Sequence, residues 1–142
     1  MHENKIGDII VQCAINLHRE LGSGLLEVVY QVVLARELET YGLKVEREVP
    51  VAIEYKGIKF DQGFRADLIV EKKVIVVPRS HATTRPDAKQ TGSLKSVDKV
   101  SAAHKKQLLT YLRLNDLKLG YLLNFGDALM KDGISRIING QL

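Results

Sequence analysis

Apolar residues recur every three or four positions in two stretches near the start of the chain, over residues 6–21 and 26–38. This spacing places the apolar side chains on one face of a helix. We therefore predict amphipathic helices over residues 4–21 and 25–41. Each is followed by a glycine, which is a common C-terminal stop.

The pattern then changes to the alternation that is typical of β-strands. Apolar and polar residues alternate over residues 44–55, and Lys56-Gly57 has the composition of a hairpin turn. Two further apolar, β-branched runs, Gly63–Val70 and Val74–Val77, are joined by a short charged turn. We predict three consecutive strands, of which the last two form a β-hairpin.

The regular pattern is lost after Val77. Residues 78–93 are polar, lack periodicity and contain two of the three prolines in the chain. We interpret residues 78–93 as a loop insertion that is exposed, mobile and dispensable for folding.

The pattern returns in the last third of the chain. We predict a helix from about Ser101 to Leu114, an apolar strand over residues 117–125, a turn over residues 131–133 and a final strand over residues 134–138. The predicted order is ααβββαββ in a single domain that covers the whole chain, residues 1–142. Its fold class is α+β with three layers, as in α/β proteins: a mixed β-sheet flanked by helices.

Composition narrows the class of protein. Of the 142 residues, 45% are hydrophobic and 27% are charged, which is ordinary for a soluble globular domain. Cys13 is the only cysteine, so an internal disulfide and a cysteine-based zinc site are excluded. No apolar run is long enough to span a membrane, and the first residues lack the apolar core of a signal peptide. We expect a cytoplasmic protein with no membrane partner.

The charge is concentrated in one part of the chain. The net charge is +4, but residues 72–106 contain nine Lys or Arg against two acids, so this stretch carries +7 and the remainder −3. Such a stretch fits a surface that meets phosphates. A solvated basic loop and helix face explains the same charges equally well.

Asp67 is a carboxylate within an otherwise apolar predicted strand. Burying it without a partner would cost several kcal/mol. We therefore expect Asp67 to hold a metal ion, a cationic side chain or a hydrogen-bond donor.

Several separate motifs carry a resemblance to a known family. Gly24-Leu25-Leu26-Glu27-Val28-Val29-Tyr30 fits the signature Gly-x-x-Glu-x-x-Tyr. In this respect the chain resembles the GxxExxY proteins of the PD-(D/E)XK nuclease-like superfamily, which share a restriction-endonuclease-like core. Further matches follow in the family's order: Val45–Gly57, Arg65–Leu68, Val74–Val76, Lys95–Val97, His104, Gln107–Leu112 and Lys131–Ile134.

The resemblance implies a role for each matched position. Asp67 and Glu27 would hold the metal, Mg²⁺ or Mn²⁺, since these ions prefer carboxylate oxygens. Lys95 would orient the attacking water, and Gln107 would be a catalytic residue of the following helix. Without the resemblance, Glu27 is explained by the favourable placement of an acid at a helix N-terminus. The further candidates are Tyr30, His104 and Tyr111.

The catalytic strand departs from the family pattern. The family reads Val-Ile-Val-Glu-Leu-Lys-Ser, whereas this chain has Val77-Pro78-Arg79 after the third residue. Read straight through, the valine replaces the Glu and the arginine replaces the Lys. Read with an insertion over residues 78–93, Ser93 replaces the Glu and Lys95 keeps the place of the strand lysine. We prefer the second register because the sequence after Lys95 also matches. The catalytic Glu is absent in both.

We therefore expect a metal-dependent nuclease-like protein that acts on or binds nucleic acid, DNA or RNA, and that is catalytically impaired by the missing Glu. Whether it is an enzyme stays open. The alternative is a non-catalytic interaction protein that retains the nuclease fold. Metal binding through Asp67 and Glu27 would distinguish the two.

Overall fold

The structure is a computed structural model that describes residues 1–80 and 93–142, with residues 61–64 and 93–101 described by their backbone alone. None of the helices in these ranges combines the length and the apolar composition needed to cross a lipid bilayer. The elements are α1 (Glu3–Leu21), α2 (Glu27–Thr40), β1 (Val45–Tyr55), β2 (Ile58–Val70), β3 (Val74–Arg79), α3 (Ser93–Leu114), β4 (Leu119–Asn124), α4 (Met130–Gly133) and β5 (Ile134–Ile138).

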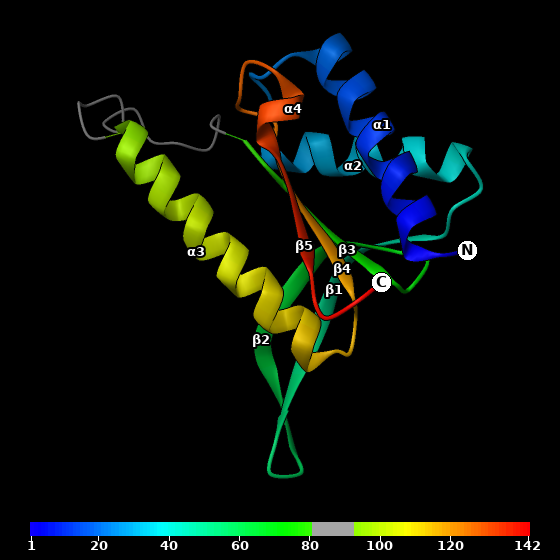
Figure 1. The fold of residues 1–142 in the computed structure, drawn as a ribbon, viewed down its shortest axis with the longest axis vertical. Helices are drawn as coiled ribbons and strands as arrows, with labels where there is room; N and C mark the ends of the chain where they lie inside the picture. The colour runs from blue at the N-terminus through cyan, green and yellow to red at the C-terminus, as the bar shows by residue number, and fades with distance from the viewer. Residues whose placement is uncertain (81–92) are drawn as a thin grey trace.

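The strands form one five-stranded sheet in the order β1-β2-β3-β4-β5. Of the strands that the structure describes, only β3 and β4 run parallel, and the connection between them contains α3. Helices α1 and α2 cover one face of the sheet and α3 covers the other (Figure 1). The predicted α+β fold, a mixed sheet flanked by helices, is confirmed. The single-turn helix α4 stands where a turn was predicted.

The core consists of two clusters, one on each face of the sheet. The first joins α1 and α2 to the sheet and includes Val74 and Val76, and the second joins α3 to the sheet and includes Ile75 and Val77. Strand β3 is therefore buried on both faces, which explains its continuous run of β-branched residues.

Two predicted boundaries around the insertion are wrong. Strand β3 continues to Arg79, and Pro78 and Ser80 are buried, so the expected exposed loop does not begin at Pro78. Helix α3 begins at Ser93, not near Ser101, and Lys95 lies in this helix and not on a strand. The remainder of the predicted insertion, residues 81–92, lies outside the described residues.

A proline within a central strand requires an explanation, because proline has no N–H to donate to the ladder. The ladder between β2 and β3 ends at the pair Leu68–Val76. The Arg79 carbonyl accepts a hydrogen bond from Phe125 N–H just after β4, at 2.8 Å. Since backbone groups of successive strand residues point to opposite sides, Pro78 faces the side of β2, where the ladder has already ended. Its missing N–H therefore leaves no β2 partner unpaired.

Candidate functional site

Asp67 lies where β2 stops pairing with β3. The register of the hairpin, continued by one residue, places Asp67 opposite Val77. Its side chain is only 21% exposed and accepts a hydrogen bond from Arg79 Nη1 at 3.0 Å. Of the partners expected for Asp67, a metal ion, a cation or a donor, the structure shows a cationic donor from the neighbouring strand.

Glu27 also contacts the Arg79 guanidinium, at the same nitrogen as Asp67. It is the first residue of α2, and its Oε2 lies 3.6 Å from Arg79 Nη1. The structure thus brings together the two carboxylates that the sequence singled out, with one Arg79 nitrogen between them. All three side chains are less than one-third exposed, so this cluster is better shielded from water than a surface ion pair.

The segment that carries Glu27 is fixed by Tyr30. The Tyr30 hydroxyl donates to the Gly22 carbonyl at 2.5 Å and accepts from Leu25 N–H at 3.2 Å. Its ring is fully buried and stacks on Phe125 with 4.4 Å between centroids. Tyr30 therefore anchors the loop that leads into α2. These contacts give the Gly-x-x-Glu-x-x-Tyr spacing a structural reason, with the tyrosine positioning the loop and the glutamate facing the site.

Ser80 is a site residue that the sequence did not single out. It is buried, and its hydroxyl donates to the Leu25 carbonyl at 2.5 Å. This bond ties the end of β3 to the loop before α2. The signal was present in the sequence, because Arg79-Ser80 stands where the family has Lys-Ser. Pro78 obscured it by suggesting that the strand had ended.

Helix α3 contributes its predicted residues unequally. The half-buried His104 lies close enough to Arg79 for the two to interact: burial, and secondly the Arg79 charge, lower the pKa of the imidazole. Gln107 is exposed, and Tyr111 is half-buried against the α3-side core. The side chain of Lys95 lies outside the described residues. The cation that the structure places between the carboxylates is Arg79, as in the register read straight through.

Arg79 also controls the acidity of Asp67. Burial raises the pKa of this carboxyl, the charge and the hydrogen bond of Arg79 lower it, and the charge of Glu48 raises it further, with a net shift above the usual value. Arg79 therefore offsets part of the rise in the Asp67 pKa that burial causes.

Replacing Arg79 with Met is expected to raise two pKa values at once. The pKa of Asp67 rises because its counter-charge is lost, and the pKa of His104 rises because a repelling charge is lost. The pKa of Asp67 in the folded state would then lie even further above its unfolded value, so R79M loses stability at neutral pH, where the carboxyl is forced to ionise without its counter-charge. It regains part of that stability as the pH falls through the raised pKa.

NMR titration of the Asp67 carboxyl carbon and the His104 ring protons measures both shifts. R113M, which removes an exposed arginine from the far end of α3, is the matched control. Unchanged titration of both groups in R79M would show that Arg79 does not control the electrostatics of the site.

The donor set does not fit a divalent metal ion. In the described ranges, no three His, Cys, Asp or Glu residues gather into a group that could hold one. The position opposite Asp67 is occupied by Val77, which has no ligand atom, and both carboxylates already face a cation. Glu48, the next acid nearby, accepts from Gln31 and pairs with Arg65.

The family model described as the PD-(D/E)XK nuclease superfamily matches residues 4–91 and 92–137. No curated protein and no solved structure shows a significant match to the chain.

Proposed function

Because the chain belongs to the PD-(D/E)XK nuclease superfamily, we propose that it is a nuclease-fold protein that binds nucleic acid and does not cleave it with a metal ion. The observation that supports this proposal is the Arg79 guanidinium between Asp67 and Glu27. A bound Mg²⁺ needs several oxygen ligands whose charge is available to it. Here the positive charge of Arg79 already neutralises part of the negative charge of Asp67 and Glu27.

The expected chemistry of the site follows from Val77 and Arg79. A metal-dependent nuclease uses the ion to polarise the phosphoryl group and to lower the pKa of the attacking water. With valine in place of the glutamate, the carboxylate that would complete this site is missing. Arg79 can still bind a phosphate group, because a planar guanidinium recognises phosphate through paired N–H groups.

Within the superfamily, the proposal places the chain among the GxxExxY proteins, on the basis of Gly24, Glu27 and Tyr30. In this proposal, Arg79 and not Lys95 takes the place of the lysine on the family's catalytic strand. Tyr30 is a positioning residue, since it holds the loop before α2. Gln107 and Tyr111 are proposed to support the site from α3, and His104 to face the bound phosphate.

The proposed nucleic-acid surface is the exposed lysine-bearing face of α3, the helix whose His104 interacts with Arg79. Lys105 and Lys106 are exposed and directly follow His104, whose pKa responds to Arg79. Lys95 and Lys99 lie one or more turns earlier in the same helix. A helix with this charge beside a partly neutralised carboxylate pair favours a phosphate backbone as partner, of either DNA or RNA.

Charge reversal on α3 tests this surface. The double variant K105E/K106E is expected to bind labelled nucleic acid at least about tenfold more weakly at low salt. The slope of log K against log salt is expected to fall by about one to two, because up to two phosphate contacts are lost. Fluorescence anisotropy with single- and double-stranded DNA and RNA measures both quantities.

The matched control is K5E/K118E, which changes the net charge equally. Lys118 directly precedes β4, at the opposite end of the parallel pair from Arg79 and Asn124, and Lys5 lies in the first turn of α1. Equal weakening in both double variants would show that only net charge matters and would contradict a surface on α3. Failure of the unaltered chain to bind any of the four nucleic acids at low salt would favour the interaction-protein alternative.

A further inference from the structure

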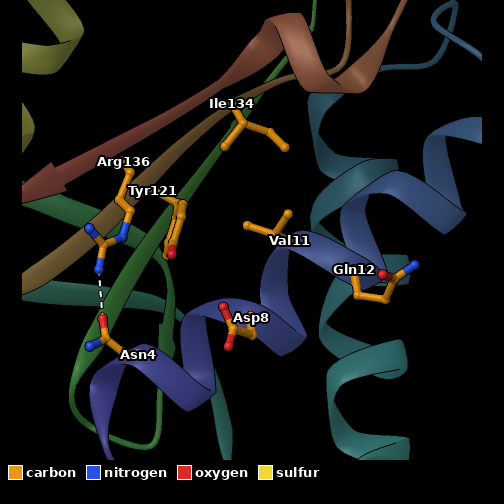
Figure 2. A pocket seen from close by; sticks show the side chains of 7 residues that line it. All are labelled: Asn4, Asp8, Val11, Gln12, Tyr121, Ile134 and Arg136. Carbon is orange, nitrogen blue, oxygen red and sulfur yellow. Dashed lines mark hydrogen bonds between the residues drawn. The ribbon is translucent and has the colours of Figure 1, made fainter.

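A second site lies between α1 and the strands β4 and β5. Helix α1 leaves an open pocket of about 490 Å³ against the sheet, within the size range of small-molecule sites (Figure 2). Asn4, Asp8, Val11 and Gln12 occur at helical spacing and form the α1 wall, and Tyr121, Ile134 and Arg136 form the sheet wall.

The geometry of the sheet wall is set by strand pairing. Tyr121 on β4 and Arg136 on β5 are direct cross-strand partners, so their side chains leave the same face of the sheet. Ile134 is paired with Leu123 two residues further along and points to that face as well. The side chains of Tyr121, Arg136 and Ile134 therefore all face α1.

Tyr121 reaches the pocket because α1 has a glycine at the point of contact. A Cβ on Gly7 would lie only 2.3 Å from the Tyr121 hydroxyl, so any larger residue there would displace the ring. Tyr121 is 4% exposed, and its hydroxyl lines the pocket without a hydrogen-bond partner in the part of the chain that the structure describes. Since none of the buried side-chain polar atoms in the described residues lacks a partner, this unpaired hydroxyl is reached by solvent from the pocket, and it is available to a ligand.

The two walls also offer opposite charges that do not neutralise each other. Arg136 donates to Asn4 Oδ1 at 2.6 Å, which steadies its guanidinium beside Tyr121. Asp8 stands on α1 across from these two groups (Figure 2). Among the described residues, neither Arg136 nor Asp8 forms an ion pair. The pocket thus presents donors on one side, an acceptor on the other, and apolar contacts from Val11 and Ile134.

We propose that this pocket binds a small zwitterion of the α-amino-acid class with a short apolar side chain. The ligand carboxylate would accept hydrogen bonds from Tyr121 and Arg136, and its ammonium group would pair with Asp8. The apolar side chain would contact Val11 and Ile134. This binding is independent of the nucleic-acid proposal, since the pocket shares no residue with the cluster around Arg79.

Isothermal titration calorimetry with three matched probes tests the ligand class. L-valine carries both charges, isovalerate lacks the ammonium group, and isobutylamine lacks the carboxylate. L-valine is expected to bind at least about tenfold more tightly than either analogue. Isovalerate has no ammonium group to pair with Asp8, and isobutylamine has no carboxylate to accept hydrogen bonds from Tyr121 and Arg136. No detectable binding of L-valine at millimolar concentrations, or equal binding of isovalerate, would overturn the proposal.

Variants locate the site. Y121F is expected to weaken L-valine binding about tenfold while the melting temperature stays unchanged, because the hydroxyl has no partner in the described part of the protein. D8N is expected to weaken L-valine and leave isovalerate unaffected. The control Y55F makes the same change at an exposed tyrosine of the β1–β2 hairpin. Unchanged L-valine binding in Y121F and D8N would place the ligand elsewhere and overturn the assignment.

Discussion

Metal-dependent cleavage is expected to appear when β3 is restored to Val-Ile-Val-Glu-Leu-Lys by the combined substitutions V77E, P78L and R79K. The glutamate would stand opposite Asp67 and supply the missing ligand, and the lysine would remove the guanidinium that occupies both carboxylates. A misplaced catalytic group can cost about 10²-fold in rate, so restoring a ligand and the strand lysine together should give at least that gain. Cleavage of labelled DNA and RNA with Mg²⁺ or Mn²⁺ measures it.

Two further variants test whether the restored activity depends on Asp67 and on the register of β3. Adding D67A to the repaired chain should abolish the new activity. A second repair, V77E with residues 78–93 deleted, tests the other register, in which Lys95 would join the strand. The structure favours the first repair, since β3 already extends through Arg79 and Ser80 fixes its end to the loop before α2. Activity in the deletion variant alone would contradict the register seen in the structure.

The largest loss of stability is expected from G133A. A Cβ at this glycine, the last residue of α4, would lie 2.2 Å from the backbone carbonyl oxygen of Asn124. A backbone atom cannot rotate away as a flexible side chain can, so the end of β4 must shift. Strain of this kind costs about 1–3 kcal/mol of the free energy of unfolding. Because the residue after Asn124 donates to the Arg79 carbonyl, the shift is expected to disturb the site as well.

Urea unfolding of G133A beside G24A provides the comparison. Gly24 is the glycine of the Gly-x-x-Glu-x-x-Tyr motif, yet nothing in the described part of the chain lies within 4 Å of a Cβ built there. G24A is therefore expected to change the free energy of unfolding by no more than about 0.5 kcal/mol. A G133A protein as stable as G24A would show that α4 and β4 can separate at no cost.

The sequence predicted those parts of the fold that depend on local periodicity. Helix α1, the β1–β2 turn at Lys56-Gly57 and the hairpin that carries Asp67 were all predicted close to their observed positions. The convergence of Asp67 and Glu27 was also expected, although it depended on a resemblance and not on spacing. These features are determined by residues near in sequence or by a motif that keeps its spacing.

The features that were missed depend on contacts between distant residues. Pro78 indicated the end of a strand, but it is tolerated because β2 has already stopped pairing, which a local pattern cannot show. Helix α3 begins eight residues earlier than predicted, although Leu94, Val97 and Val100 already recur at three-residue spacing. Arg79 was considered as the replacement for the strand lysine only in the register that was not preferred, and the fold brings it into contact with both carboxylates.

The unaltered chain is expected to bind nucleic acid without cleaving it, and one assay measures both properties. The unaltered protein and D67A are incubated with labelled single- and double-stranded DNA and RNA, with and without Mg²⁺ or Mn²⁺. We expect anisotropy to detect binding while both proteins leave every substrate intact, because Arg79 and Val77 replace the groups that would hold the metal. Metal-dependent cleavage by the unaltered chain that D67A abolishes would contradict this expectation.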